Sequence, residues 1–368
     1  MDPFTENLRK ESYLPKLHSI YSVNNLNEIY SPLFTNEDLS IFKSLQRPSS
    51  NQVEILGKYA SLISEGYERI TKIFSEMLGG DSVTGEYLLL NLISRVHTRK
   101  DALTLGNLSV NLTNIPQPSQ IPKKGSFSSL PLAISSLYES IIGRLLYLPL
   151  SLDILDKWEF VPKKNHETNE LEHGLLQLTK HTSILIDETA LSAGTLQKKG
   201  IANLEHLNHM ITNMSTQYDF QFSQVEFLND FKVLICSEGE SLFKNNTILC
   251  PIDSQCALQI DLESISNVSQ EDLILIRTYL QLVSHPALRF EIGEEISQIV
   301  QEDFIKARAD KDSKITPDSM HLWLNLSRLL SLARGKLNLE NEEYSAVKEM
   351  EQIRNLRIQE YQEQKNKK

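Results

Sequence analysis

The sequence predicts an α/β fold in which short apolar strands alternate with helices, followed by an all-helical region. Short apolar runs at residues 182–186 and 233–236 have the length and residue types of buried strands. Between them, residues 201–214 carry apolar side chains three and four positions apart, as an amphipathic helix does. After Pro286 only helical patterns remain. Strands that alternate with helices favour a mostly parallel sheet.

The composition bounds the class of protein. The chain has 368 residues, 40% hydrophobic and 23% charged, which allows a substantial core and about two or three structural units. Its formal net charge of −11 disfavours a general nucleic-acid-binding surface, because neutralising phosphates requires excess Lys and Arg. An acidic chain fits better with a basic protein partner. We therefore expect no direct contact with nucleic acid.

Targeting and metal signals are weak. The chain starts without an apolar signal region, and no run approaches the ~18 apolar residues that a membrane span needs. We therefore expect no membrane partner. The three cysteines are odd in number, and the spacing of Cys250 and Cys256 matches no zinc pattern. Reduced thiols, with no metal and no cofactor, are the expectation.

The first half of the chain shows clear periodicity. Residues 55–77 form an amphipathic helical pattern that Gly79 and Gly80 end. Residues 86–97 are apolar nearly all round, which indicates a helix buried within the domain. Residues 108–113 alternate as a half-buried strand does. Residues 115–129 are rich in Pro, Gly and Ser and are typical of a loop.

The rest of the chain continues the pattern. Helical periodicity returns at residues 130–146, and a further β-like run lies at 224–227. In the C-terminal region, residues 292–307 and 339–350 are helical, and Thr316-Pro317-Asp318 is a strong helix start. After Glu351 the chain is polar and charged, which predicts a helix with a frayed, solvated end.

These patterns divide the chain into units. We expect an N-terminal arm at 1–50, a core at 51–285 with a loop or insertion at about 114–129, a helical lid at 286–350 and a charged tail at 351–368.

The run Ser183-Ile-Leu-Ile-Asp187-Glu188-Thr189 resembles the Walker B strand of a P-loop ATPase. There the Asp orients the Mg²⁺ shell and the Glu polarises the attacking water. That chemistry also needs a G-x-x-x-x-G-K-[ST] loop, whose amides and Lys hold the phosphates, and the sequence contains none. An α/β core with a helical region behind it is the layout of AAA+ ATPases. The prediction is an AAA+-like fold that has lost catalysis.

Several residues occupy the positions of such a degenerate nucleotide site. Upstream, where the phosphate loop is expected, the chain reads Gly79-Gly-Asp-Ser-Val-Thr-Gly-Glu86, and a Glu stands where the phosphate-binding Lys belongs. Ser237 follows the strand at 233–236, in the place of a sensor residue, although a structural turn is the more ordinary interpretation. The degenerate positions are Gly80, Asp81, Ser82, Glu86, Asp187, Glu188 and Ser237.

Other candidate sites are weaker. His206 and His209 are spaced so that they could share a metal, but a solvated helix face is favoured because no HExxH pattern accompanies them. Arg328 and Arg334 lie on the predicted C-terminal helix. In an active AAA+ lid an Arg there could reach a neighbour's phosphate. Here a salt bridge or a partner-binding contact at an interface rim is expected instead.

Beyond generic architecture, the sequence resembles the mini-chromosome maintenance (MCM) complex-binding protein family over roughly residues 50–360. Ile184-Leu-Ile-Asp-Glu-Thr and Val233-Leu-Ile-Cys-Ser-Glu-Gly-Glu-Ser-Leu carry part of this resemblance. The other matching segments are 80–101, 105–112, 174–178, 218–220, 316–324 and 329–334.

The resemblance implies a nuclear, non-enzymatic protein that binds subunits of the MCM replicative helicase. It further implies a role in assembling, protecting or unloading the helicase during DNA replication, and in sister-chromatid cohesion. The family's α/β region is itself similar to the MCM ATPase domain with its catalytic residues lost. Family members usually carry a further, long N-terminal region, so we expect either a short member or part of a longer protein.

Two alternatives remain open. A divergent AAA+-class ATPase acting on a protein complex would use an unrecognised phosphate site around residues 79–82, and its turnover would depend on Glu188. A chromatin or DNA-binding module would retain DNA in a salt-sensitive way, which the acidic charge disfavours.

Overall fold

The computed structural model describes residues 52–100, 103–121, 126–220, 222–243, 247–286, 288–309 and 317–366. The expected N-terminal arm lies outside these residues. The helices are α4 (Gln52–Lys58), α5 (Ala60–Met77), α6 (Ser82–Ile93), α7 (Leu130–Ile141), α8 (Leu152–Lys157), α9 (Lys198–Asn213), α10 (Ser254–Ala257), α11 (Gln270–Val283), α12 (Glu294–Ala309), α13 (Pro317–Ala333) and α14 (Asn341–Asn366), with 3₁₀ turns η1 (Glu188–Ala190) and η2 (Ser264–Asn267). The strands are β1 (Thr98–Lys100), β2 (Leu103–Leu105), β3 (Val110–Thr113), β4 (Leu145–Pro149), β5 (Lys163–Asn165), β6 (Glu170–Glu172), β7 (Ser183–Asp187), β8 (Ser215–Asp219), β9 (Gln224–Leu228), β10 (Lys232–Cys236) and β11 (Ile248–Pro251).

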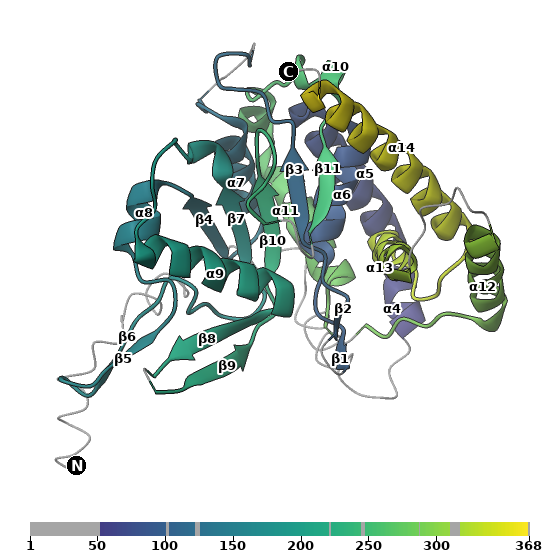
Figure 1. Cartoon of the computed structure of the whole chain (residues 1–368). Helices are drawn as coiled ribbons and strands as arrows, with labels where there is room; N and C mark the ends of the chain where they lie inside the picture. Colours follow the sequence, from purple (N-terminus) through teal and green to yellow (C-terminus); the bar gives the residue numbers. More distant parts are fainter. Residues whose placement is uncertain are drawn as a thin grey trace.

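A five-stranded sheet forms the centre of the molecule, in the order β11-β3-β10-β7-β4 (Figure 1). Every pairing in it is parallel, with Ile235 of β10 opposite Ile186 of β7. The predicted parallel α/β core is therefore confirmed. Because the strands are parallel, all their carboxyl ends meet at one edge, where side chains from different strands come together.

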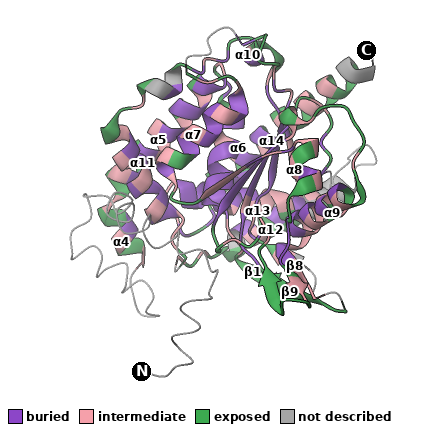
Figure 2. Ribbon diagram, turned by 90° about the vertical axis from the view of Figure 1, so that its left-hand side faces the viewer, coloured by how far each residue is buried: buried purple, intermediate pink, exposed green. Residues whose placement is uncertain are grey.

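Helices cover both faces of this sheet. Along β10, Leu234 and Cys236 pack into the core that contains α5, α6, α7 and α11, whereas Val233 and Ile235 pack with residues of α8 and α9. This alternation follows from the two-residue period of a strand. Figure 2 shows the strands as a buried layer between helices.

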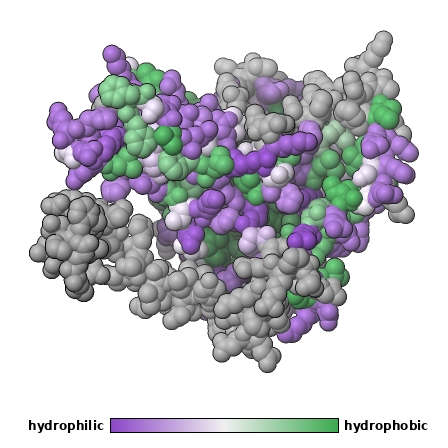
Figure 3. Space-filling model, turned by 90° about the horizontal axis from the view of Figure 1, so that it is seen from below, coloured by the Kyte–Doolittle hydropathy of each residue, from purple (hydrophilic) through white to green (hydrophobic). Residues whose placement is uncertain are grey.

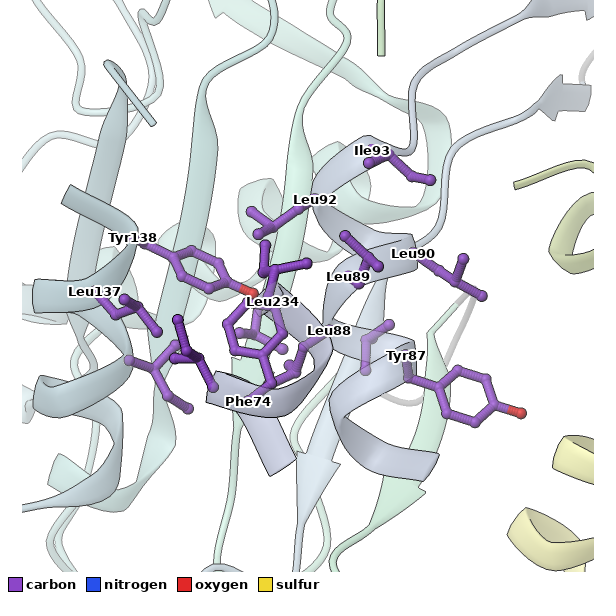
Figure 4. Packing of buried hydrophobic residues seen from close by; sticks show 14 of the residues in the cluster. Phe74, Tyr87, Leu88, Leu89, Leu90, Leu92, Ile93, Leu137, Tyr138 and Leu234 are labelled. Atoms are coloured by element: carbon purple, nitrogen blue, oxygen red, sulfur yellow. The ribbon is translucent and has the colours of Figure 1, made fainter. Parts of the chain in front are cut away.

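The helix predicted to be buried is confirmed, with shifted ends. It spans Ser82–Ile93 because the Asp81 side chain accepts a hydrogen bond from the Thr84 amide and caps its first turn. From Tyr87 to Ile93 all its residues are buried. Figure 4 shows Leu88 and Leu92 on the side of Phe74, Tyr138 and Leu234, whereas Tyr87 points away from them. A helix apolar on most sides is stable only in such surroundings.

Two strand predictions need correction. The helical pattern at 130–146 ends at Ile141, and Leu145–Pro149 forms β4 instead, because an apolar run of this length suits a buried strand equally well. The strand near 224–227 exists as β9, but it belongs to a separate sheet of order β6-β5-β8-β9 and pairs antiparallel with β8. The hairpin β1–β2 is separate from both sheets.

The region after Pro286 contains the predicted helices α12, α13 and α14. Residues of α13 and α14 share one hydrophobic core with α5, α6 and α11, so both ends of the described chain contribute to the same helical layer. Ile296 and Val300 of α12 instead pack in a smaller cluster with Met320 and Tyr344. Helix α14 continues past Glu351 to Asn366, where the sequence predicts a frayed end. In the described part of the chain, no helix has both the length and the apolar character required to cross a bilayer.

Candidate functional site

The acidic pair Asp187-Glu188 lies at the carboxyl edge of the parallel sheet. Asp187 is the last residue of β7, between β4 and β10, and its side chain is buried. Glu188 opens the 3₁₀ turn that follows. The edge position results from the parallel pairing of β7 with both neighbours, which brings the end of each strand to the same side.

Asp187 is fully engaged by neighbouring donors. Its Oδ2 accepts a hydrogen bond from the Tyr147 hydroxyl at 2.6 Å. Its Oδ1 accepts from the Thr189 amide at 2.9 Å and from the Thr189 hydroxyl at 2.6 Å. Burial and the adjacent carboxylate raise the pKa of the Tyr147 hydroxyl, which therefore stays protonated and remains a donor. The carboxylate caps a turn and ties β4 to β7.

Glu188 is held by the segment after β10. Its Oε1 accepts hydrogen bonds from the Ser241 hydroxyl at 2.8 Å and from the Leu242 amide at 3.1 Å. Burial raises the pKa of Glu188 to about 7, with a smaller contribution from Asp187, while the two hydrogen bonds act in the opposite direction. Near neutral pH this carboxyl therefore exists in both protonation states.

Ser237 joins the same edge from β10. Its hydroxyl donates to the Asn111 side chain at 3.0 Å and lies 3.2 Å from the Gly239 carbonyl. The Thr113 hydroxyl donates to the same Gly239 carbonyl at 2.7 Å. Ser237 thus connects β10 to β3 and fixes the turn at Gly239.

The structure therefore gathers Asp187, Glu188 and Ser237 in what we call the strand-edge cluster, together with Tyr147, Thr189, Ser241, Asn111 and Thr113. Its carboxylates accept hydrogen bonds from the protein's own groups, which is how buried polar atoms are normally satisfied. Sequence reasoning missed Tyr147, because the residues just before it were interpreted as helix and no strand was predicted there. Ser241 had no local signal, since its partner is Glu188, far away in the chain.

The candidate residues upstream in the sequence, Gly80, Asp81, Ser82 and Glu86, lie around the start of α6. Asp81 accepts a hydrogen bond from the Asp253 amide at 3.0 Å, just beyond the edge strand β11. This strand is three positions from β7 in the sheet order, or roughly 14 Å at ordinary strand spacing. Gly80 and Ser82 flank Asp81, and Glu86 accepts a hydrogen bond from the Tyr67 hydroxyl of α5. Within the described part of the chain, none of the hydrogen bonds of these four residues reaches Asp187, Glu188 or Ser237.

Arg328 and Arg334 are separated on α13. Arg328 donates to the Gly106 carbonyl at 3.0 Å. Arg334 forms ion pairs with Glu342 and Glu343 at 3.2 Å each, and a salt bridge is one of the two roles that the sequence suggests for it. It also lines a cavity of about 560 Å³ between α4, α5 and the α13–α14 turn.

No histidine pair forms a metal site in the described part of the chain. Three carboxylates close enough to share an ion occur there only at Glu340, Glu342 and Glu343, and the Lys336 ammonium already contacts Glu340 and Glu343 at 2.8 Å each. His209 instead lies 3.1 Å from Glu226 of β9, an ion pair when protonated.

Comparison with known proteins gives a consistent result. The family model of the mini-chromosome maintenance replisome factor matches residues 5–358. Among curated relatives, the "Mini-chromosome maintenance complex-binding protein" of Gallus gallus is 31% identical over 95% of this chain and 52% of its own length. The proteins of that name from Homo sapiens and Drosophila melanogaster are each 32% identical over 86% of this chain, and over 48% and 51% of their own lengths. The chain thus spans about half the length of these relatives.

Proposed function

Because the chain belongs to the mini-chromosome maintenance replisome factor family, we propose that it is a non-catalytic binding protein of the MCM helicase. The family match over residues 5–358 is the observation that carries this proposal. The relatives' name describes binding to the MCM complex, and their similarity extends over nearly all of this chain.

The strand-edge cluster supports a lack of catalysis. A Walker B carboxylate must be available to the Mg²⁺ shell, whereas both oxygens of Asp187 accept bonds from Tyr147 and Thr189. The connection between β3 and α7, residues 114–129, contains no G-x-x-x-x-G-K motif. Pro116 and Pro118 in it lack the backbone N–H that a phosphate cradle uses.

We further infer that the α/β core is AAA+-like and acts by mimicry. The parallel strands β3, β4, β7, β10 and β11 are numbered 1 to 5 in chain order. In the sheet they lie in the order 5-1-4-3-2, an order that AAA+ cores use, and the acidic pair stands at the end of strand 3. A domain of this shape could dock beside a genuine MCM ATPase module, on the face that a neighbouring subunit uses. Without a phosphate loop it completes no active site, so the partner is held in an inactive, incomplete assembly.

The proposed setting follows from that activity. Holding MCM subunits apart from the complete helicase would regulate assembly, protection or unloading during DNA replication in the nucleus, and would thereby support sister-chromatid cohesion. Direct binding to nucleic acid is not part of this proposal, because the chain's net charge of −11 repels phosphates.

The test is size-exclusion co-elution of the purified chain with single MCM subunits and with pairs of them, with and without ATP. We expect co-elution that does not require ATP. Failure with every subunit, when a longer family member tested in parallel does co-elute, would show that this chain alone is not the binding module.

A second measurement addresses the ATPase alternative. We expect no ATP turnover above background, either alone or with MCM subunits. Turnover that Glu188→Gln abolishes and Glu226→Gln leaves intact would establish a divergent ATPase instead. Salt-sensitive retention on DNA would favour the chromatin-binding alternative.

A further inference from the structure

A group of cations lies at the amino-terminal edge of the parallel sheet, opposite the strand-edge cluster. Arg95 follows α6, Lys232 begins β10, and Arg328 lies on α13. We call these three residues the cation cluster. They come from segments far apart in the sequence, and His97 and His285 lie beside them.

The hydrogen-bond partners of these cations are neutral. The Arg95 guanidinium donates to the Ser284 carbonyl at 2.9 Å and lies 3.1 Å from the His181 ring. Arg328 donates to the Gly106 carbonyl at 3.0 Å, and the Lys232 ammonium donates to the Leu92 carbonyl. Neutral carbonyls orient the three positive charges but do not neutralise them.

Asp230 lies close enough to Arg95 and Lys232 to favour their charged forms, but its oxygens already accept other hydrogen bonds. One oxygen accepts from the Val96 amide at 2.8 Å, and the other lies 3.0 Å from the His181 ring. Burial alone would raise the pKa of Asp230, but these hydrogen bonds and the positive charge of Arg95 hold it below its ordinary value. Arg95 and Lys232 thus share one carboxylate, whereas buried charges are normally paired.

Mutual repulsion between the positive charges of the cation cluster also indicates that these charges are not neutralised. Burial lowers the pKa of Lys232 to about 8 and that of Arg328 to about 10, and in both cases the charge of Arg95 adds to the effect. Burial and Arg95 likewise lower the pKa of His285, and burial and Arg328 lower that of His97. An arriving anion would relieve this repulsion.

The three residues of the cation cluster are buried in part and reach the surface in part. Arg95, Lys232 and Arg328 are each partly exposed, and His97 is exposed. Figure 3 views the molecule from below, where the hairpin β1–β2 of Figure 1 lies, and shows a largely hydrophilic surface across the middle of this side. A local positive charge in a chain of net charge −11 selects for a short anionic segment, because a long polyanion would meet repulsion elsewhere on the surface.

We propose that the cation cluster is an interaction surface that binds a Glu- or Asp-rich segment of a protein partner. Charge complementarity identifies the occupant, since arginine and lysine side chains presented together bind carboxylates through charge-assisted hydrogen bonds. The inference relies on the proposed function only for identifying that partner as an MCM subunit.

The direct test is fluorescence anisotropy of a labelled oligoglutamate peptide titrated with the intact chain. Arg328→Gln and Lys232→Met should each weaken binding by about tenfold, as expected when one of several partly buried charge contacts is lost. Arg277→Gln is the matched control, because its guanidinium also donates to a backbone carbonyl, that of Ser140 at 2.7 Å. Its binding should equal that of the unmodified chain.

Thermal unfolding separates a binding role from a structural one. Without peptide, Lys232→Met should unfold at the same temperature as the unmodified chain or higher, because it removes a repelled charge. With peptide, only the unmodified chain and Arg277→Gln should show the full stabilising shift. A marked loss of stability in both cluster variants without peptide would indicate that the cations serve the fold alone.

Two results would overturn the proposal: peptide binding that neither cluster variant weakens, or tighter binding of inorganic phosphate or single-stranded DNA than of oligoglutamate.

Co-elution with MCM subunits distinguishes this proposal from the proposed function. If both variants co-elute normally and also bind the peptide normally, the surface is wrong and MCM binding stands. If no form of the chain co-elutes but the variants lose the peptide, the surface stands and its partner is another protein.

Discussion

At the residue scale, buried carboxylates organise the turns of this protein. Asp187 caps the turn after β7, and Asp81 caps α6 while receiving hydrogen bonds from Asp253 and Arg357. Both are acids that the sequence indicates as degenerate nucleotide-site positions, and in the structure each accepts hydrogen bonds from neighbouring residues of the chain. The geometry gives each acid a structural role.

Glu188 should make stability depend on pH. Its folded pKa of about 7 lies above the ordinary value of 4.5, so the fold favours the protonated form, and stability falls as pH rises between these values. Glu188→Gln keeps an oxygen acceptor but cannot ionise. Between about pH 5 and pH 8 we expect the unfolding free energy of this variant to rise, relative to that of the unmodified chain, by on the order of 1–2 kcal/mol. Urea unfolding at several pH values measures this difference.

Glu226→Gln is the control for that series. Hydrogen bonding from Ser215, together with His209, holds the pKa of Glu226 below its ordinary value, so the pH dependence should have the opposite sign. A Glu188→Gln advantage that does not change with pH would contradict the assigned protonation behaviour.

The paired glycines between α5 and α6 offer a second residue-scale prediction. Gly79 has φ +70°, and a Cβ there would lie 2.1 Å from the Cys256 carbonyl oxygen. Gly80 has φ +98° with open space around it. Gly79→Ala should therefore lower the free energy of unfolding by about 3 kcal/mol or more, because steric overlap adds to backbone strain. Gly80→Ala should cost only about 1–2 kcal/mol. Equal losses of unfolding free energy would contradict the role of the overlap.

At the element scale, α14 is longer than its polar sequence suggests because its charged residues have partners in the core. Arg354 pairs with Glu351 at 2.7 Å and donates to the Leu249 carbonyl of β11 at 3.0 Å. Arg357 pairs with Asp81 at 2.9 Å. These contacts attach the middle of α14, residues 351–357, to the start of α6 and to the sheet edge, so this part of the helix is structural.

Removing Arg357 should therefore destabilise the whole protein. Arg357→Ala leaves the fully buried Asp81 carboxylate without its cation, for which we expect a loss of about 3 kcal/mol. Lys72→Ala, which breaks an exposed pair with Glu76, should leave the denaturation midpoint unchanged. An Arg357→Ala midpoint as high as that of the Lys72→Ala control would show that the pair contributes little.

At the scale of the whole molecule, the helical layer is continuous from one end of the described chain to the other. Residues of α5, α6, α11, α13 and α14 belong to one hydrophobic core that also includes residues of β3 and β10. Burial shared in this way couples the stability of the C-terminal helices to that of the sheet. The helical region at 286–350 is therefore expected to unfold together with the core.

The two tryptophans can test this coupling. Trp158 follows α8 beside the sheet, and Trp323 lies on α13. In Trp158→Phe and Trp323→Phe, the remaining tryptophan reports on one region, and its fluorescence midpoint in urea should match the far-UV circular dichroism midpoint of the same variant. Separate midpoints within either variant would instead establish an independent lid.

The sequence by itself determined the parallel α/β core, the helical C-terminal region, the acidic pair at a strand end and the family. Apolar periodicity and short local motifs are properties of neighbouring residues, so they can be read before folding. Only the tertiary structure decided that residues 145–149 are a strand, that β9 lies outside the main sheet and that α14 runs to Asn366. It also decided that Tyr147 donates a hydrogen bond to Asp187 and Ser241 one to Glu188. The tertiary structure likewise places Arg95, Lys232 and Arg328 at the amino-terminal edge of the parallel sheet. Each of these depends on contacts between residues distant in sequence, where burial and pairing override local propensity.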